Sequence, residues 1–237
     1  MIIIPARVAS SRFPNKVLVD INGYPMVIAT ALRVKEVDDV IIATDSDRVI
    51  KEAKKHNFEA IMTSDSHKSG TDRVNEVANI LKLKDSEIVI NVQADEPFIE
   101  PEVVQSLYKR VKLALDRDED VLMCSCYKKI DSILANDPHH VKVVIDKNSY
   151  ALYFSRSKIP YETKLQNEYL GHLGIYGFSK KSLNKFCLLK SSPLEEMEKL
   201  EQLRALYHGE KIAMIEVKSS SFGIDTVEDL KRALQTL

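Results

Sequence analysis

Residues 1–26, MIIIPARVASSRFPNKVLVDINGYPM, set the pattern that the rest of the chain repeats. An apolar run at residues 1–4 leads directly into Pro5-Ala6-Arg7, and Ser10 and Lys16 follow before the next apolar run. A buried strand that ends in a small, basic, hydroxyl-bearing loop is suited to receive an anion. A solvated basic loop would have the same composition, but its position at a strand end favours an anion site.

The composition limits what this anion can be. A chain of 237 residues fits one large α/β domain, or a domain with a lobe. With a net charge of -1 and 29% charged residues, no global basic field points to nucleic acid, so an anion site must be local. The apolar runs are far shorter than the roughly 20 residues that cross a membrane, and the first residues do not resemble a signal peptide. We therefore expect a cytoplasmic protein without nucleic-acid or membrane partners.

Short β-branched runs alternate with longer helical patterns. Strands are predicted at residues 1–4, 40–43, 88–92, 121–126 and 213–217, and helices at residues 26–35, 48–55, 71–81 and 102–117. Runs such as IIIP and IVINV do not alternate with polar residues, which is typical of parallel strands covered on both faces. The fold class predicted is α/β, a single Rossmann-like domain with a mostly parallel sheet. Ligands of such sheets bind beyond the carboxyl ends of the strands.

The middle of the chain departs from this alternation. Residues 140–146, 150–155 and 173–178 predict strands with little helix between them, and Asn148 supplies a turn between the first two. We interpret residues 138–178 as an inserted β-rich lobe. Cys124 and Cys126 lack partners with zinc spacing, so they are interpreted as small buried apolar residues.

A helix is predicted to begin at Ser192-Pro193 with a capping box and to end near Gly209. Its apolar residues recur at every third position and predict a stripe for the core or a subunit contact: Leu194, Met197, Leu200, Leu203 and Leu206. Its polar residues are interpreted first as a solvated face, with a functional role as the alternative: Glu198, Glu201, Gln202 and Arg204.

Phosphate, if bound, must be held without a glycine-rich cradle. The chain has 7 glycines and contains neither G-x-x-x-x-G-K-[ST] nor G-x-G-x-x-G after a strand. The loop after the first strand offers an alternative, because Arg7 provides a planar fork and Lys16 a mobile point charge for an extended polyphosphate. Ala6 and Ser10 are small enough for backbone N–H groups to approach the same ligand.

Two further strand ends carry polar residues. Gln93, Asp95 and Glu96 close the strongest predicted strand, and such oxygen ligands suit Mg²⁺ together with phosphate. An acid that caps the following helix is the alternative interpretation. Asp225, at another strand-to-helix junction, could supply the second carboxylate. The turn from Ser69 to Arg73 enters a helix, where N–H groups could meet a base or phosphate; taken alone, it is a capped helix.

Segments from one end of the chain to the other carry a family resemblance. They are IPARVASSRFPNKVLVDINGYPM, ATDSDRV, SGTDRVNEV, NVQADEPFI, VKVVID, YALYFSRSKIP, HLGIYGF, SPLEEMEKLEQLR and GIDTVEDL. In this order they resemble the 3-deoxy-D-manno-octulosonate (Kdo) cytidylyltransferases, the CMP-Kdo synthetases. The patterns YFSR-x-x-IP, HLGIYG and PLE-x-x-E-x-LEQLR distinguish this branch from cytidylyltransferases for other acid sugars.

The resemblance implies a nucleotidyltransferase domain that converts CTP and Kdo to CMP-Kdo and pyrophosphate with Mg²⁺, for lipopolysaccharide assembly, and a homodimer in which the lobe contributes to the contact. The same likeness assigns residues to three groups. The nucleotide residues are Ala6, Arg7, Ser10, Lys16, Ser69, Gly70, Arg73, Gln93 and Ala94. The metal residues are Asp95 and Asp225, which with Arg7 and Lys16 are the catalytic set. The sugar residues are Tyr153, Arg156, His172, Tyr176, Glu201 and Gln202. Lys142 lies in a shared motif without an assigned role.

Two positions depart from the family pattern. Ala94 stands where the family usually has glycine, and a methyl group there narrows the approach of the nucleotide and strains any positive φ. Val227 stands where the family usually has proline, which costs some helix pre-organisation. Two alternatives remain open at this point: a cytidylyltransferase for another acid sugar, such as an acylneuraminate or 8-amino-Kdo, and a catalytically silent nucleotide-binding protein.

Overall fold

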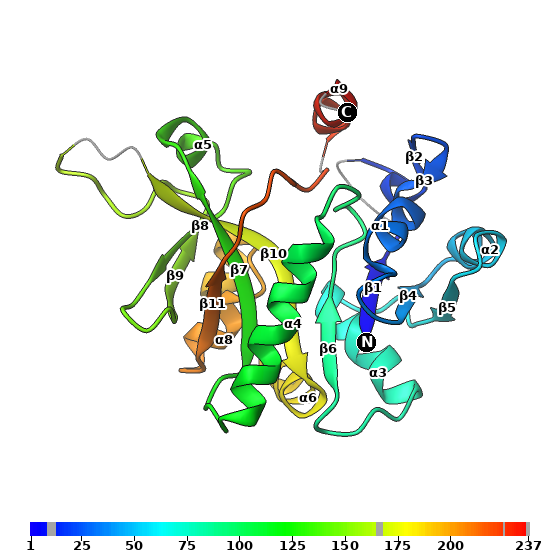
Figure 1. Ribbon diagram of the computed structural model, residues 1–237, viewed down its shortest axis with the longest axis horizontal. Helices are drawn as coiled ribbons and strands as arrows, with labels where there is room; N and C mark the ends of the chain where they lie inside the picture. The colour runs from blue at the N-terminus through cyan, green and yellow to red at the C-terminus, as the bar shows by residue number, and fades with distance from the viewer. Residues whose placement is uncertain (9–12, 165–167, 225, 236–237) are drawn as a thin grey trace. The chain divides into compact units, whose positions relative to one another are not determined.

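The computed structural model describes residues 1–8, 13–164, 168–224 and 226–235. The chain forms two compact units (Figure 1). The first contains Met1–Leu83, Val89–Gln105 and Ser220–Leu237, and the second contains Lys84–Ile88 and Ser106–Ser219. The Ser10 and Asp225 predicted for the site lie outside the described residues.

A parallel sheet forms the centre of the first unit. Its strands lie in the order β6 (Ile88–Asn91), β1 (Ile2–Ala6), β4 (Val40–Thr44) and β5 (Glu59–Met62). All three pairings are parallel, with Ile2 opposite Val40 in β4 and Ile90 in β6. Every residue of β1 is buried, as expected for a parallel strand covered on both faces. The predicted α/β architecture is confirmed here, and β5 is a strand that the sequence did not reveal.

The helices α1 (Met26–Val34), α2 (Asp47–Lys55) and α3 (Gly70–Ile80) connect these strands, and α9 (Val227–Gln235) belongs to the same unit. The 3₁₀ turn η1 (Lys16–Leu18) and the hairpin of β2 (Asp20–Ile21) and β3 (Tyr24–Pro25) precede α1. Both α1 and α3 pack against β1 and β4, and α2 packs against β5. Because each crossover returns the chain to a parallel strand, the loops after β1, β4, β5 and β6 meet at one edge of the sheet.

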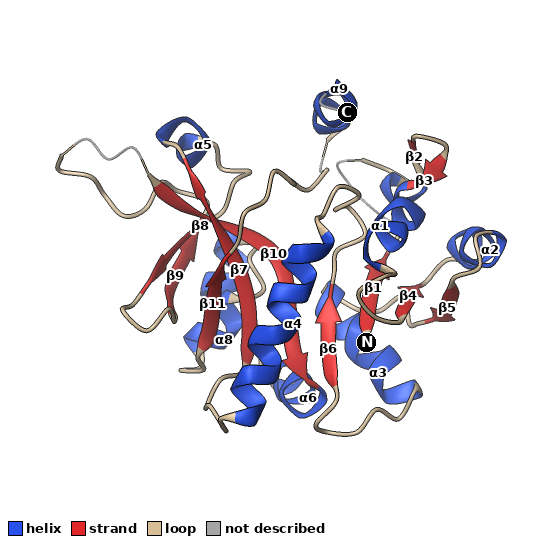
Figure 2. Cartoon of the chain, viewed as in Figure 1, coloured by secondary structure: helices blue, strands red, loops and turns tan. Residues whose placement is uncertain are grey.

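Antiparallel pairing dominates the second unit (Figure 2). Its strands are β7 (Met123–Ile130), β8 (Lys142–Ile145), β9 (Ala151–Ser155), β10 (Tyr169–Ser179) and β11 (Ile212–Glu216). β10 pairs antiparallel with β7 and β8, β8 pairs antiparallel with β9, and β11 runs parallel to β7. The predicted hairpin between β8 and β9 is confirmed, although Ser149, not Asn148, takes the left-handed conformation in its turn. That residues 138–178 form an inserted lobe stays a prediction.

The second unit also contains short helices: α5 (Ser132–Asn136), α6 (Lys180–Leu188), α7 (Pro193–Glu198) and α8 (Leu203–Tyr207). The long helix α4 (Pro101–Asp116) begins in the residues of the first unit and ends in those of the second. Cys124 and Cys126 are buried in β7, as predicted, and burial raises the pKa of the Cys124 thiol to about 12.

The prediction of one continuous helix after Ser192 is wrong. The capping box of Ser192 and Glu195 forms, but α7 ends at Glu198 and Lys199 takes the left-handed conformation. The Glu198 carbonyl, which would continue the helix, instead accepts a 2.7 Å hydrogen bond from Arg156 Nε. The expected stripe is therefore broken, with Met197 exposed, and the expected solvated face is partly buried because Gln202 is only 1% exposed.

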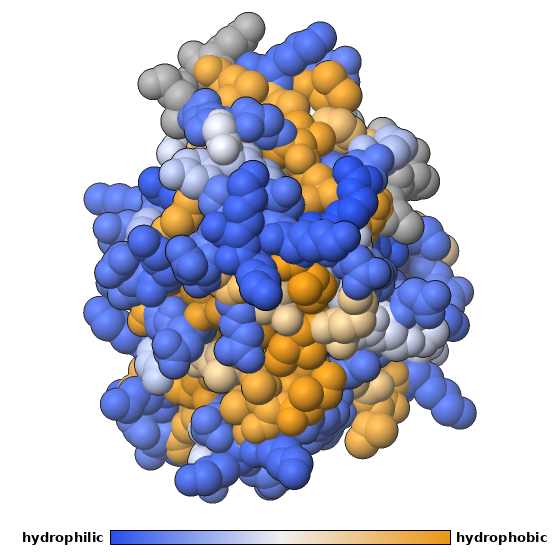
Figure 3. All heavy atoms as spheres, turned by 90° about the vertical axis from the view of Figure 1, so that its right-hand side faces the viewer, coloured by the Kyte–Doolittle hydropathy of each residue, from blue (hydrophilic) through white to orange (hydrophobic). Residues whose placement is uncertain are grey.

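The surface carries apolar residues between polar ones. On the face drawn in Figure 3, hydrophobic patches in orange lie among hydrophilic ones in blue. Exposed apolar residues of this kind are common on proteins and do not by themselves mark a docking site. Among the described helices, none has the length and apolar character needed to span a membrane.

Candidate functional site

A pocket of about 260 Å³ lies where the loops of the first unit meet. It is lined by Pro5, Arg7, Lys16, Val17, His67, Lys68, Ser69, Gly70, Arg73, Gln93, Ala94 and Asp95. The strand ends of β1 and β6 and the start of α3 thus bring together most of the residues predicted to bind the nucleotide. Ala6 ends β1, is fully buried and is not among the residues that line the pocket.

Close packing at the start of α3 shapes one wall of this pocket. The Ser69 hydroxyl caps the helix by accepting the backbone N–H of Asp72 at 3.1 Å. A β-carbon on Gly70 would lie 3.2 Å from Pro5 Cγ and 3.3 Å from Gln93 Oε1, so a side chain there would require its neighbours to shift by a few tenths of an ångström. Gln93 Nε2 donates to Asn91 Oδ1 at 2.9 Å, which turns the Gln93 acceptor oxygen toward Gly70.

Arg73 is a buried cation with its own partners. Its Nη2 lies 2.6 Å from Asp45 Oδ2, and its Nη1 donates to Thr63 Oγ1. Asp45 follows β4 and Thr63 follows β5, so Arg73 joins two strand ends from α3. Part of its charge is neutralised by Asp45. The exposed Arg7 makes no ion pair among the described residues, which leaves its guanidinium available to an anion.

Lys16 and Asp95 form an ion pair within the pocket. Lys16 Nζ lies 2.6 Å from Asp95 Oδ2, and their side chains are 10% and 27% exposed. Lys16 comes from η1 and Asp95 from the loop after β6, so the pair links residues far apart in sequence. A partly buried carboxylate held beside a lysine and open to the pocket can face both a cation and a phosphate group.

Ile224, the residue before Asp225, is hydrogen-bonded to the loop that carries Asp95. Its backbone N–H donates to the Asp95 carbonyl at 2.9 Å. Within the described residues, no three His, Cys, Asp or Glu side chains are gathered closely enough to hold a metal. The donor chemistry nevertheless fits Mg²⁺, which is commonly held by one or two carboxylates together with phosphate oxygens and water.

Ala94 is accommodated without strain. It is 4% exposed and is not among the described residues with positive φ. Its carbonyl accepts the Thr30 hydroxyl at 3.0 Å, which anchors this loop to α1. The backbone conformation that would require glycine is therefore not used at this position.

The second unit places Arg156 just after β9, where its guanidinium is held by backbone carbonyls. Its Nε donates to Glu198 and its Nη1 to Pro138, at 2.7 and 3.1 Å. The Glu198 carboxylate in turn accepts Ser155 Oγ and the Arg156 backbone N–H, at 2.6 and 2.9 Å. Tyr153, earlier in β9, has its pKa raised by burial and then by Glu198. Glu198, which the sequence analysis assigned to a solvated face, is thus the anchor of the predicted sugar residue Arg156.

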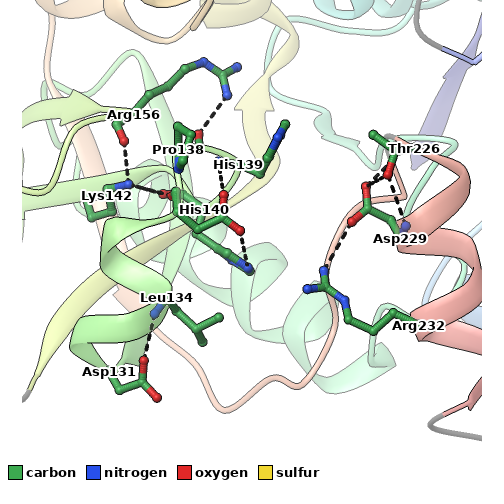
Figure 4. A network of polar contacts seen from close by, with 11 residues as sticks. Asp131, Leu134, Pro138, His139, His140, Lys142, Arg156, Thr226, Asp229 and Arg232 are labelled. Atoms are coloured by element: carbon green, nitrogen blue, oxygen red, sulfur yellow. Dashed lines mark hydrogen bonds and ion pairs between the residues drawn. The ribbon is translucent and has the colours of Figure 1, made fainter.

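Lys142 is a fully buried lysine whose role becomes clear from its three acceptors (Figure 4). Its Nζ donates to the carbonyls of Asp137, His140 and Arg156, at 3.0, 2.6 and 2.6 Å. Burial lowers the pKa of Lys142. The ammonium of Lys142 thus joins the loop before β8 to the backbone of Arg156 by hydrogen bonds. Lys142 therefore holds the backbone of a predicted sugar residue in place.

Replacing Lys142 by methionine is expected to lower the free energy of unfolding by about 3 kcal/mol, because buried carbonyls lose their donor. The KM for the acid sugar that Arg156 is predicted to bind should rise as well. Urea unfolding and steady-state kinetics measure the two effects. Lys180→Met is the matched control, since Lys180 is 2% exposed in the same unit. An equal rise of KM in both variants would contradict the supporting role.

A hydrogen-bonded cluster joins three predicted sugar residues. Gln202 Nε2 lies 3.4 Å from His172 Nδ1, and Tyr176 OH donates to Gln202 Oε1 at 3.1 Å. The His172 ring packs against the rings of Phe154 and Tyr176, with centroid distances of 4.8 and 5.7 Å. Burial lowers the pKa of His172 to about 3. Burial raises the pKa of Tyr176, and the negative charge of Glu201 raises it further. Glu201, another of the predicted sugar residues, thus interacts electrostatically with this cluster.

His172 should make the protein less stable as the pH falls. Its folded pKa of about 3 lies below the ordinary 6.5, so the unfolded chain binds more protons between these values. The stability contributed is complete above about pH 6.5 and is lost as pH falls toward 3, which amounts to about 2 kcal/mol between pH 7 and pH 5. Urea unfolding at both pH values should show this loss reduced in His172→Gln. The exposed His208→Gln variant is the control, and an unchanged pH dependence in His172→Gln would refute the assignment.

The sequence reasoning missed several neighbours of the predicted residues. His67 and Lys68 line the pocket and immediately precede the recognised Ser69-Gly70 turn, so their position was a usable signal. Asp45 lies in the quoted segment ATDSDRV, but neither it nor Ser125 could be matched to its partner, because Arg73 and His172 are far away in sequence. That the gathered residues bind nucleotide and sugar stays a prediction.

The chain is similar in sequence and in fold to known proteins. Residues 1–212 match the family model described as Cytidylyltransferase. A 3-deoxy-manno-octulosonate cytidylyltransferase of Nitratiruptor sp. is 57% identical over 98% of this chain and 97% of its own length. One of Wolinella succinogenes is 53% identical over 99% and 98%. A solved structure of CMP:2-keto-3-deoxy-manno-octonic acid synthetase complexed with CTP has a TM-score of 0.88 and 38% identity, covering 99% of this chain and 96% of that one.

Proposed function

The chain belongs to the cytidylyltransferase family, and on that premise we propose that it transfers the cytidylyl group of CTP to Kdo, forming CMP-Kdo and pyrophosphate. It is a nucleotidyltransferase enzyme. The pocket at the strand ends supports the assignment of the nucleotide site. Arg7 and Lys16 line it together with the small residues Ser69 and Gly70.

The triphosphate of CTP is assigned to the loop after β1 and to η1. Arg7 offers an exposed guanidinium, and Lys16 offers an ammonium within the pocket. Ala6 and Ser10 add backbone and hydroxyl groups by the family resemblance. The cytidine is assigned to the opposite wall, with Ser69, Gly70, Arg73, Gln93 and Ala94. Gln93 is suited to bind the base, because its side-chain oxygen can accept a hydrogen bond from the amino group of cytosine.

Magnesium is proposed as the cofactor, held by Asp95 and Asp225. The contact of Ile224 with the Asp95 carbonyl supports this pairing, because it ties the residue next to Asp225 to Asp95. When bound, the ion supplies positive charge beside the reacting phosphate and the sugar acid.

In the proposed reaction, the anomeric hydroxyl of Kdo attacks the α-phosphorus in line. A new oxygen–phosphorus bond forms, the bond to the bridging oxygen of pyrophosphate breaks, and the hydroxyl proton leaves to solvent. Arg7 and Lys16 offset the charge that grows on the leaving pyrophosphate. Little covalent work falls to the protein, so positioning and charge neutralisation dominate.

The acid sugar is assigned to the second unit. Arg156 is held at Nε and Nη1 by backbone carbonyls, which fixes its guanidinium to pair with a carboxylate that neutral sugars lack. Tyr153, His172, Tyr176, Glu201 and Gln202 are proposed to contact the hydroxyl groups. We further propose a cytoplasmic homodimer that supplies CMP-Kdo for lipopolysaccharide assembly.

Pyrophosphate release from CTP and Kdo with Mg²⁺ tests this proposal directly. Parallel reactions replace Kdo by N-acetylneuraminate or 8-amino-Kdo, and CTP by other nucleoside triphosphates. Release with CTP and Kdo alone is expected. Release with another acid sugar only would keep the mechanism and reassign the sugar residues, whereas CTP binding without release from any pair would favour a silent nucleotide-binding protein.

A further inference from the structure

Ser125 is a fully buried residue of β7 that touches the ring of His172. Its Oγ lies 2.9 Å from His172 Nε2 and 2.8 Å from the carbonyl oxygen of Ile175. The register between β7 and β10 shifts between Leu173 and Tyr176, so Ile175 lies in a bulge. The serine therefore joins this bulge to the histidine.

The single hydrogen of the serine hydroxyl decides which nitrogen of His172 carries a proton. The carbonyls of Ile175 and Leu173, at 2.8 and 3.3 Å from Ser125 Oγ, can only accept, so the hydroxyl hydrogen is directed to them and not to His172. Ser125 Oγ must then accept from His172, which places the ring hydrogen on Nε2 and leaves Nδ1 as an acceptor. Burial keeps the ring neutral near pH 7, because it lowers the pKa of His172 to about 3.

The protonation of His172 in turn fixes the amide of Gln202. An accepting Nδ1 requires the Gln202 NH₂ group to face the ring, at 3.4 Å. The Gln202 oxygen is then left to accept from Tyr176 OH at 3.1 Å. With the hydrogen on Nδ1 instead, the amide would turn around and the Tyr176 hydroxyl would have to accept.

We propose that Ser125 is a positioning residue for the sugar acid: through the ring nitrogens of His172 it sets the orientation of the Gln202 amide and of the Tyr176 hydroxyl. This inference rests on the proposed function, because those three residues are the proposed sugar contacts. Donors and acceptors with a fixed orientation favour one pattern of sugar hydroxyls, since a mismatched buried polar group loses its hydrogen bond.

Kinetics of Ser125→Ala test the proposal. We expect the KM for Kdo to rise about tenfold, the typical effect of one buried hydrogen bond, with kcat and the KM for CTP within about twofold. Ser125→Thr keeps the hydroxyl and should restore the KM for Kdo. Cys124→Ala is the matched control, because Cys124 is 1% exposed in the same strand and, as the preceding residue, faces the opposite side. A rise of KM no larger than that of Cys124→Ala would overturn the proposal.

A measurement that does not depend on catalysis tests the role of Ser125 independently of the proposed function. Nitrogen-15 NMR of histidine-labelled protein, with the His172 signals assigned by their loss in His172→Gln, should show the hydrogen on Nε2 in the unsubstituted protein and a mixture in Ser125→Ala. A hydrogen on Nδ1 in the unsubstituted protein would refute the inference. Ser125→Cys keeps the volume and weakens both bonds, so it should shift the mixture in the same direction if the alanine variant does not fold. Absence of CMP-Kdo formation would refute the proposed function and leave the NMR result intact.

Discussion

Asp95→Asn is expected to reduce the rate of CMP-Kdo formation at least a hundredfold. The carboxylate is the described member of the proposed magnesium pair and is held 2.6 Å from Lys16 in the pocket. An amide keeps the shape and loses the negative charge, which both Lys16 and a cation require. Loss of one charged contact that acts in the transition state typically costs about 2–4 kcal/mol. Single-turnover kinetics at several Mg²⁺ concentrations measure the effect.

The fold should survive this substitution. The carbonyl of Asp95, which accepts from Ile224, is part of the backbone and does not change. Asp47→Asn, at an exposed position in the first turn of α2, is the control for loss of one carboxylate from the same unit. A rate within fivefold of the unsubstituted enzyme would refute the role of Asp95, whereas a weaker dependence on Mg²⁺ concentration without loss of folding would support it.

Lys16→Ala is expected to lower kcat by about a hundredfold or more, the second large effect. Its ammonium lies in the pocket that Arg7 also lines, and it is the proposed partner of the leaving pyrophosphate. Because that charge grows during the reaction, kcat should fall more than the affinity for CTP. Rapid-quench kinetics and CTP titration distinguish the two quantities.

Lys51→Ala provides the matched loss of one positive charge, since Lys51 is exposed on α2 and outside the pocket. The Lys16–Asp95 pair also permits a double-variant test. If their only role were mutual stabilisation, Lys16→Ala combined with Asp95→Asn would recover much of the rate. Near-normal kcat in Lys16→Ala, or such a recovery, would contradict the assignment of Lys16 to phosphate.

Local sequence pattern was sufficient for the framework of the fold. The unbroken apolar runs around Ile3 and Ile90 predicted buried parallel strands, and both strands form with fully buried residues at these positions. Parallel strands direct their carboxyl ends to one edge of a sheet, so Arg7 and Asp95 could be expected near one another without any structure. The capping box at Ser192 was equally local, because its partner Glu195 lies one helical turn away.

Contacts between residues far apart in sequence required the tertiary structure. Periodicity predicted a helix through Lys199, but hydrogen bonds from Ser155 and Arg156 to Glu198 end it there. Because α7 ends at Glu198, the following residues turn back toward it. Arg204 is buried there, with its Nη2 2.6 Å from Glu195 Oε1. A local pattern records how a segment can bury its own apolar face, but it does not specify which distant polar group will take a carbonyl or a charge.

The sequence by itself thus determined most of the strands, the family and most of the residues at the candidate site. Only the tertiary structure decided the partners of those residues: Asp95 beside Lys16, Asp45 beside Arg73, and three carbonyls around Lys142. The role inferred for Ser125 depends on the same level of structure, because a strand bulge brings a carbonyl and a histidine to one hydroxyl group. Burial makes these pairings necessary, since a polar group removed from water must find a partner wherever the fold provides one.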